Sequence, residues 1–280
     1  MILIADCGST KIDWCVVNGA EIVRRVFTGG MNAVMLTEEE MAARIAEELM
    51  PQLGDELIDE VYFYGAGCLA PEVCDNVRRA IAGNIPTASK IEVDTDLLAA
   101  ARALCGRKPG IACIMGTGSN SCYYDGERIC DNVSPLGYIL GDEGSGAVLG
   151  KLLIGDVLKN QLPADLCEKF LAQYQLDRLT IIRRVYKEPQ TNRFLASVTP
   201  FLIQNIERKE IHDLVLNSFK AFFRRNVLQY KDARQLSVNL IGSIAYYYRA
   251  VLEEAARECG LTVGTIIKSP MEGLVAFHCS

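Results

Sequence analysis

The sequence predicts an α/β protein with mixed sheets, assembled from two copies of one strand plan. Three strand-like runs at residues 2–6, 12–17 and 21–28 are joined by tight polar turns. The same series of strand, glycine-rich turn, strand, Asp-Gly turn and strand returns at 111–131. Helix-like and strand-like segments alternate after the first series, which is typical of α/β proteins. We therefore expect an internal structural duplication, although residue identity between the two halves is low.

The first half continues as an alternation of helices and strands. The turn between its second and third strands is expected at Asn18 and Gly19, a favoured hairpin pair. Thr37, followed by three glutamates, predicts an N-cap with a capping box and a helix that runs to about residue 49. Pro71 predicts the start of the next helix. The remaining expected elements are strands at 61–64 and 90–94 and a helix at 97–104.

The second half follows residues 107–110, whose polar, Pro- and Gly-containing sequence predicts a domain junction. The Asp-Gly pair at 125–126 predicts a two-residue hairpin turn, and 145–230 is expected to be mainly helical. We therefore expect domains at 1–107 and 108–280, with a last helix that can pack back on the first domain. The other expected elements are strands at 237–241 and 264–268 and that last helix, which begins at Pro270.

Length and charge limit the class of protein. The 280 residues exceed a typical single core, half of them are hydrophobic, and two domains are expected. No run reaches the ~18 apolar residues that a membrane helix needs, and the N-terminus enters an apolar strand without a secretory signal. The net charge is −6 and Lys and Arg are not clustered, which argues against nucleic acid or an anionic membrane as the main partner. We therefore expect a cytoplasmic protein.

Eleven cysteines are present, an odd number, and no two have C-x-x-C spacing. Most of them stand in apolar strand-like or helical contexts, where cysteine serves as a small hydrophobic residue. Reduced thiols in a cytosolic enzyme are therefore expected, rather than disulfides or a metal–thiolate site.

The glycine-rich turns carry the first indication of function. The segment 116–118 directly follows an apolar run, and its successive backbone N–H groups can form a concavity that suits an anion. The turn at 7–11 occupies the same place in the first half, so two turns could hold the phosphates of one nucleotide from opposite sides. Asp6, at the end of a central strand, could then hold Mg²⁺ through water. Neither the P-loop motif nor a strand-coupled G-x-G-x-x-G is present.

Phosphoryl transfer to an alcohol also needs a carboxylate that accepts the hydroxyl proton. Asp94, Asp96 and Asp142 are the candidates near predicted strand ends and helix starts. Asp96 could instead be the N-cap of the helix that follows it. Asp142 and Glu143 could instead be favourable negative charges at a helix N-terminus. Reasoning from the residues alone leaves these alternatives open.

Six short motifs are spread along nearly the whole chain. They are Asp6-Cys-Gly-Ser-Thr10, Gly30-Met-Asn32, Thr95-Asp96, Gly116-Thr-Gly-Ser-Asn120, Gly141-Asp-Glu-Gly-Ser145 and Leu240-Ile-Gly-Ser-Ile-Ala245. With these motifs the chain resembles the N-acetylglucosamine kinases, within the sugar kinase/actin-like ATPase superfamily, and the spacing between the fourth and fifth motifs is the most specific part. The resemblance implies two ribonuclease H-like domains with mixed five-stranded sheets and an inter-domain cleft for the sugar.

The resemblance also implies a role for each matched residue. Asp96 would be the catalytic base and would contact the sugar, and Asp6 would hold Mg²⁺ through water. Two departures from the family pattern concern the nucleotide: Cys7 and Ser9 replace glycines of some relatives, and 241–243 is Ile-Gly-Ser where many have three glycines. The implied nucleotide-binding residues are Asp6, Gly8, Ser9, Thr10, Lys11, Gly116, Thr117, Gly118, Gly242 and Ser243, of which the last two would lie by the adenosine. The implied sugar-binding residues are Asn32, Asp96, Ser119, Asn120 and Asp142.

The implied activity is ATP- and Mg²⁺-dependent phosphorylation of an amino sugar, best assigned as N-acetylglucosamine to its 6-phosphate. N-acetylmannosamine, N-acetylmuramic acid and glucosamine remain alternatives, and a homodimer is compatible with the sequence. One competing function is the ATPase that activates 2-hydroxyacyl-CoA dehydratases, which holds an iron–sulfur cluster through cysteines that 141–146 lacks. Another is a non-catalytic sugar sensor, although the sequence has no basic recognition helix.

Overall fold

The computed structural model describes residues 1–8, 11–54 and 56–279. The chain forms two compact units. Unit 1 comprises Met1–Lys108, the short segment Gly126–Arg128 and the segment that begins at Ser269, and unit 2 comprises Pro109–Asp125 and Ile129–Lys268. Among the described residues, no helix combines the length and the apolar character needed to cross a membrane. The domain bounds at 1–107 and 108–280 stay a prediction.

Unit 1 is built on a mixed five-stranded sheet with strand order β3-β2-β1-β4-β5. The first three strands are antiparallel neighbours, whereas β4 and β5 run parallel to β1. Alternate residues of β1 therefore face opposite sides of the sheet, and both sides are buried. The strands are β1 (Ile2–Cys7), β2 (Lys11–Asn18), β3 (Glu21–Gly29), β4 (Glu60–Gly65) and β5 (Lys90–Thr95).

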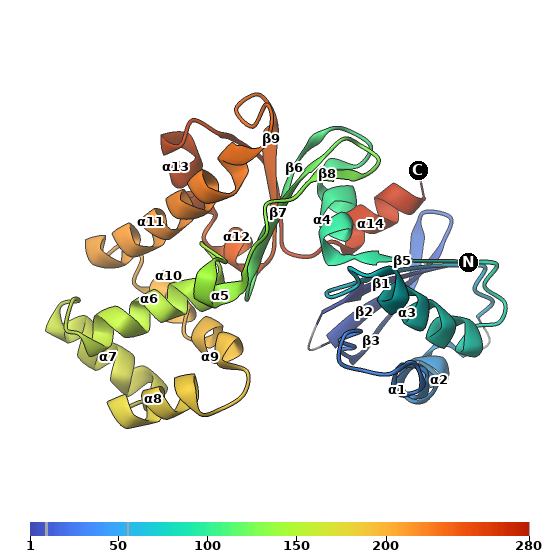
Figure 1. Cartoon of the computed structure of the whole chain (residues 1–280), viewed down its shortest axis with the longest axis horizontal. Helices are drawn as coiled ribbons and strands as arrows, with labels where there is room; N and C mark the ends of the chain where they lie inside the picture. Colours follow the sequence, from blue (N-terminus) through green and yellow to red (C-terminus); the bar gives the residue numbers. More distant parts are fainter. Residues whose placement is uncertain (9–10, 55, 280) are drawn as a thin grey trace. The chain divides into compact units, whose positions relative to one another are not determined.

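Helices cover both faces of the unit 1 sheet (Figure 1). On one face lie α1 (Glu38–Arg44), α2 (Met50–Leu53) and α3 (Pro71–Asn84), over a core that includes Leu3, Trp14 and Phe63. On the other face lie α4 (Asp96–Cys105) and the final helix α14 (Met271–His278), over Ile4 and Tyr64. The helix α4 begins directly where β5 ends, so the residue at its N-terminus is fixed at the carboxyl edge of the sheet.

The first predicted helix differs in its second half. Thr37 forms the predicted capping box with Glu40, which confirms the expected start. The expected single helix to residue 49 is interrupted, because Ile45–Leu49 adopts a π-helical turn before α2. Pro51 provides the physical reason, since proline lacks the N–H that an α-helix needs at this point and its ring crowds the preceding turn.

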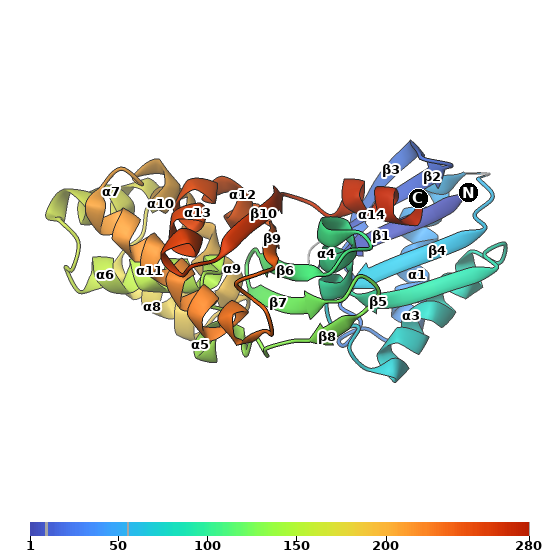
Figure 2. The same cartoon turned by 90° about the horizontal axis from the view of Figure 1, so that it is seen from above.

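Unit 2 repeats the same sheet plan. Its strand order, β10-β9-β6-β7-β8, matches that of unit 1 strand for strand, with antiparallel β6, β7 and β8 and parallel β9 and β10 (Figure 2). The predicted duplication and the mixed five-stranded sheets are therefore confirmed. The strands are β6 (Gly110–Met115), β7 (Ser119–Tyr124), β8 (Ile129–Asp131), β9 (Ser237–Ile241) and β10 (Thr262–Ile267).

The remainder of unit 2 is mainly helical, as expected for 145–230. One continuous core joins these helices to the sheet, with Phe170, Phe201 and Phe219 fully buried in it. The long helix α6 starts close to the end of β6 and packs against α9. The helices are α5 (Gly137–Leu140), α6 (Gly146–Leu158), α7 (Ala164–Tyr174), α8 (Arg178–Tyr186), α9 (Thr191–Ser197), α10 (Pro200–Gln204), α11 (Lys209–Arg225), α12 (Ser243–Tyr247) and α13 (Arg249–Glu258).

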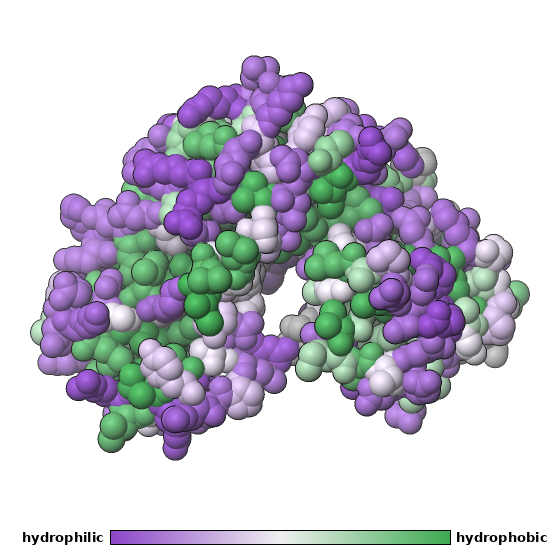
Figure 3. All heavy atoms as spheres, in the orientation of Figure 1, coloured by the Kyte–Doolittle hydropathy of each residue, from purple (hydrophilic) through white to green (hydrophobic). Residues whose placement is uncertain are grey.

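Two predicted turns and one loop need correction. The connection from β7 to β8 spans residues 125–128, so the expected two-residue Asp-Gly turn is wrong. The turn between β2 and β3 lies at Gly19 and Ala20, one residue later than predicted, and Gly19 supplies the left-handed backbone (φ +61°). The short helix α5 was not expected and exposes Ile139 and Leu140. Figure 3 shows hydrophobic surface residues scattered among hydrophilic ones on one face of the molecule.

Candidate active site

The first glycine turn joins β1 to β2 in unit 1. Its described part is closed by a hydrogen bond from the Gly8 N–H to the Lys11 carbonyl (3.0 Å). The Lys11 ammonium lies 4.9 Å from the centre of the Phe27 ring. Cys7 is buried beneath the turn and donates to the Met31 carbonyl (3.1 Å). The predicted phosphate contacts of Ser9 and Thr10 fall on residues outside those that the structure describes.

Asp6 lies at the carboxyl end of β1, next to the first turn. Burial raises its pKa to about 6, and the negative charges of Asp13 and Asp96 add to that rise. The influence of Asp96 indicates that the structure brings the predicted base and the predicted Mg²⁺-binding carboxylate close together. The other neighbour, Asp13, is held by both arms of the Arg25 guanidinium at 2.9 and 2.6 Å, so its charge is compensated.

Asp96 is the first residue of α4. The N-cap is Thr95, whose hydroxyl accepts the Leu98 N–H (3.1 Å), so the alternative assignment of Asp96 as the N-cap is wrong. Burial raises the pKa of Asp96, and the N–H of Leu97 opposes that rise. The Asp94 carboxylate instead accepts the Thr95 N–H (2.8 Å), which ties it to the strand end.

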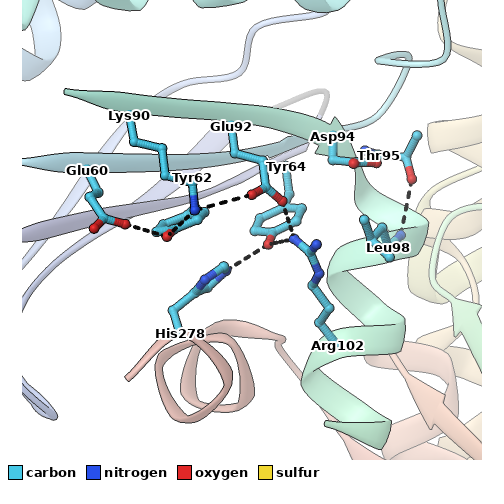
Figure 4. Close-up of polar contacts among 10 residues, drawn as sticks. All are labelled: Glu60, Tyr62, Tyr64, Lys90, Glu92, Asp94, Thr95, Leu98, Arg102 and His278. Carbon is cyan, nitrogen blue, oxygen red and sulfur yellow. Dashed lines mark hydrogen bonds and ion pairs between the residues drawn. The ribbon is translucent and has the colours of Figure 1, made fainter. Parts of the chain in front are cut away.

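The helix that bears Asp96 is fixed to the sheet by a polar network (Figure 4). Arg102, two turns along α4, donates to Glu92 on β5 (2.5 Å) and to the Tyr64 hydroxyl on β4 (2.6 Å). His278 of α14 lies 2.7 Å from the same hydroxyl and stacks on Tyr62 at 3.7 Å between ring centres. Two helices are thereby bound to neighbouring strands through one tyrosine, so the start of α4 has little freedom to move.

Asn32 lies in the loop that follows β3. Its side-chain oxygen accepts the Val34 N–H (3.1 Å), which leaves the side-chain amide N–H groups for other partners. Gly67 packs beside it with a left-handed backbone (φ +91°), and a Cβ there would lie 3.6 Å from the Asn32 oxygen. The structure therefore places Asn32 in unit 1 beside the loop that follows β4.

The second glycine turn joins β6 to β7 in unit 2. The Gly116 N–H bonds to the Gly118 carbonyl (2.9 Å). The carbonyls of Gly116 and Thr117 accept the N–H groups of Gly146 (2.8 Å) and Ala147 (3.0 Å), the first two residues of α6. The turn is thus secured to the start of α6, because its carbonyls are the acceptors for the first two N–H groups of that helix.

The predicted sugar residues of unit 2 meet beside this turn. The Asp142 carboxylate accepts the Ser119 N–H, and a Cβ at Gly118 would lie 3.0 Å from Asp142 Oδ2. Burial raises the pKa of Asp142. Asn120 is the next residue of β7, and its oxygen accepts the Ser121 N–H and the Asn132 amide, each at 2.9 Å. The helix-charge alternative for Asp142 and Glu143 does not describe this geometry, because Ser145 caps α6.

Gly242 is the N-cap of α12, and Ser243 is the first residue of that helix. Gly242 has a left-handed backbone (φ +119°), and a Cβ there would lie 2.3 Å from the Met115 carbonyl oxygen, so only glycine fits. Ser243 borders a hollow of about 440 Å³. The hollow is mostly apolar, a property suited to the planar ring of a nucleobase. Its walls are Ala196, Ser197, Thr199, Pro200, Ile203, Ser243, Ile244, Tyr247 and Tyr248.

Sequence reasoning missed several residues of this site. Ser197 and Tyr247 border the hollow but have no local motif, because α9 and α12 are brought together only by the tertiary fold. Glu143 was considered only as a helix charge, although its carbonyl accepts the Ser119 hydroxyl (2.9 Å). The buried Ser145 could have been predicted, since a serine directly before an apolar run is typical of an N-cap.

The donor set at Asp6 fits a magnesium ion that is shared with a substrate. No three His, Cys, Asp or Glu side chains in the described part of the chain are grouped closely enough to hold a metal by themselves. Mg²⁺ usually takes one or two carboxylates and completes its shell with water and phosphate oxygens. Asp6, a hard oxygen donor beside a predicted phosphate turn, suits that mode of binding.

The chain is similar to several solved structures. A candidate N-acetylglucosamine kinase from Porphyromonas gingivalis is 48% identical to it, over 100% of this chain and 99% of the other, with a TM-score of 0.96. A candidate N-acetylglucosamine kinase from Chromobacterium violaceum is 16% identical over 99% and 98%, with a TM-score of 0.74. A ROK family glucokinase from Streptomyces griseus, in complex with glucose and AMPPNP, is 12% identical over 99% and 97%, with a TM-score of 0.55. No family model and no curated protein matches the chain.

The duplicated sheets and these similarities define the class: the chain is an ATP-dependent sugar kinase with the actin-like ATPase fold. Within that class it belongs to the N-acetylglucosamine kinase family, because it shares 48% identity with a member over its whole length. The expected family, fold and enzyme class are thereby confirmed. The roles of individual residues stay predictions.

Proposed function

We propose that the protein phosphorylates N-acetylglucosamine on its C6 hydroxyl, with ATP as the donor and Mg²⁺ as the required ion. The observation that carries the proposal is Asp96, a carboxylate with a raised pKa at the start of α4. A carboxylate whose pKa is raised toward neutrality is a stronger base than an ordinary aspartate. The 48% identity to a candidate N-acetylglucosamine kinase supports the choice of substrate class.

In this mechanism each unit contributes a different part. Asp96 accepts the proton of the C6 hydroxyl as the oxygen attacks the transferred phosphoryl group. The N–H groups of the glycine turns, with Gly116–Gly118 anchored on α6, stabilise the negative charge of the phosphates. Asp6 would hold Mg²⁺ through water, and the ion, when bound, neutralises charge on the phosphate oxygens.

The sugar is held by residues that offer both donors and acceptors. Asp142 presents a carboxylate that already accepts one backbone N–H, and its remaining lone pairs suit two neighbouring hydroxyls. Asn32 and Asn120 each have amide groups that can donate to hydroxyl or acetamido oxygens. The base of the nucleotide is assigned to the hollow beside Ser243, where Tyr247 provides an aromatic wall.

A panel of sugars in an ADP-release assay tests the proposal. The panel contains N-acetylglucosamine, N-acetylmannosamine, N-acetylmuramic acid, glucosamine and glucose, and the product is identified by NMR as the 6-phosphate or another isomer. We expect kcat/KM to be highest with N-acetylglucosamine and activity to require Mg²⁺. A higher kcat/KM with another member of the panel, or no ADP release with any of them, would contradict the assignment.

A further inference from the structure

The segment 141–146 holds Asp142 in a backbone conformation that side chains rarely adopt. Asp142 has φ +53° and Gly144 has φ +73°. At Gly144 a Cβ would lie 2.5 Å from the Met115 side chain and 3.3 Å from Phe222, so the segment is pressed against the core. A left-handed aspartate persists only where surrounding contacts determine it. The contacts that fix this segment should therefore control where the Asp142 carboxylate lies.

Those contacts come from the C-terminal end of α11. Arg225, its last residue, pairs with Glu143 at 2.5 Å (Nε to Oε1), and Asn226 lies 3.4 Å from the other Glu143 oxygen. About two turns earlier in α11, the buried Ser218 hydroxyl accepts the Gly144 N–H (3.2 Å). Two consecutive residues after Asp142 are thus attached to one helix, the first by its side chain and the second by its backbone.

Glu143 also connects the segment to the second glycine turn. Its carbonyl accepts the Ser119 hydroxyl (2.9 Å), while the Ser119 N–H is the donor to the Asp142 carboxylate. Glu143 therefore joins α11, through its side chain, to the strand residue that orients Asp142. The Glu143 side chain is only 16% exposed, so it needs the cation that Arg225 supplies.

We propose that Glu143 and Arg225 are positioning residues that set the place of Asp142 for sugar binding. This inference rests on the proposed function for the identity of the ligand. It does not rest on the ion pair as a source of stability, because Arg225 is 64% exposed and such pairs contribute little to folding. If the pair acts only on folding, removing it should change stability and leave sugar affinity unchanged. If the pair positions Asp142, removing it should weaken sugar binding.

Kinetics of matched variants provide the first test, with N-acetylglucosamine as the probe. We expect Glu143→Gln and Arg225→Ala to raise KM for the sugar about tenfold, because a small displacement of a binding carboxylate is costly. KM for ATP should change less than about twofold, and the melting temperature of Glu143→Gln, which removes the buried charge together with the pair, should fall by less than about 3 °C. Arg225→Lys should recover part of the lost affinity, since it restores the charge without the planar fork.

Lys220→Ala is the matched control, because Lys220 lies on the same helix but pairs with Glu258 of α13 (2.5 Å) and not with the segment 141–146. It should leave both KM values unchanged. Unchanged sugar KM in Glu143→Gln and Arg225→Ala, with wild-type activity intact, would overturn the positioning role and leave the proposed function standing.

Amide hydrogen exchange provides a readout that needs no substrate. In Arg225→Ala, the peptide that contains Gly144 and Ser145 should exchange several-fold faster than in the wild type, whereas peptides of α13 should not change. Equal exchange in the two proteins would overturn the inference independently of catalysis. A different outcome is that the wild type is inactive on the whole sugar panel while Arg225→Ala still exchanges faster than the wild type. That outcome would overturn the proposed function and, with it, the sugar as the ligand.

Discussion

The two glycine turns follow the same strand of the same sheet plan, yet their acids are placed differently. In unit 1 the central strand itself ends in a carboxylate: Asp6 stands opposite Asp13 in the β1–β2 pair. In the corresponding β6–β7 pair of unit 2 that place is taken by Ile114, opposite Asn120. The acid of unit 2, Asp142, comes from a separate segment that bonds to the turn from outside. The two halves therefore share a glycine turn at the same place in the sheet plan, while their acids come from different places in the fold.

This difference suggests a division of labour. In unit 1, burial raises the pKa of Asp6 to about 6, and the charges of Asp13 and Asp96 add to that rise, as expected where carboxylates handle a proton and a metal ion. Asp142 is fixed by backbone geometry and by hydrogen bonds, as expected for a group that recognises hydroxyls. In order of decreasing expected effect, two of the four predictions test that contrast directly, and the other two test the packing of each unit.

Asp96→Asn should lower kcat by about 10²–10⁴-fold, because it removes the proton acceptor and keeps the shape of the side chain. The measurement is the initial rate of ADP release at saturating sugar. Asp94→Asn is the matched control, since that carboxylate lies two residues away and is tied to the Thr95 N–H. Equal losses in the two variants would remove the distinction between the base and its neighbour.

Gly242→Ala should destabilise unit 2 by about 2–4 kcal/mol, because the new methyl group would lie 2.3 Å from the Met115 carbonyl oxygen at a backbone angle that alanine avoids. Urea unfolding followed by circular dichroism measures this. Gly116→Ala is a suitable comparison, since a methyl group there would meet no heavy atom within 4 Å. A Gly242→Ala protein as stable as Gly116→Ala would contradict the close contact between β9 and the second turn.

Asp142→Asn should raise KM for the sugar by about 10- to 100-fold, since a charged acceptor of hydroxyl hydrogen bonds is replaced by a neutral amide. Its kcat at saturating sugar should fall far less than that of Asp96→Asn. Steady-state kinetics with varied sugar and fixed ATP separate the two quantities. A fall in kcat without a rise in KM would assign Asp142 to the chemical step and break the proposed contrast.

The His278 network should make unit 1 sensitive to acid. Burial lowers the pKa of His278 to about 4, and the Arg102 charge adds to this. Between about pH 6.5 and pH 4, His278 binds a proton in the unfolded chain but stays neutral in the folded chain. Stability therefore falls as the pH decreases from 6.5 toward 4. We expect His278→Gln to reduce the loss of stability between pH 7 and pH 5 by about 1–2 kcal/mol. Thermal unfolding at the two pH values measures this. Equal losses of stability in His278→Gln and the wild type would contradict a half-buried histidine that stays neutral in the folded protein.

Local sequence signals predicted most of the fold. The strand plan, the capping box at Thr37 and β9 depend on periodicity and short-range chemistry, so they were recognised in both halves. The π-helical turn before α2 was missed, because Pro51 only modifies a helix that the pattern otherwise supports. The four-residue connection after β7 was also missed, because Asp-Gly fits several loop lengths.

The site could be predicted only where its motifs are local. The composition of Gly116–Gly118 indicates phosphate binding, whereas the sugar role of Asp142 came only from the family resemblance, and both roles stay predictions. The contact of Gly242 with Met115, and that of Arg225 with Glu143, join residues far apart in the sequence. Such contacts depend on how β9 and α11 pack, which no single segment encodes. The same limit applies to the hollow formed by α9, α10 and α12.

The central claim is that the acid of unit 1 performs the chemistry while the acid of unit 2 holds the sugar. Isothermal titration of N-acetylglucosamine into Asp96→Asn and Asp142→Asn tests it most directly. We expect Asp96→Asn to bind the sugar with a Kd within about threefold of the wild type, and Asp142→Asn to bind it at least about tenfold more weakly. Weakened binding in Asp96→Asn together with wild-type binding in Asp142→Asn would contradict the account.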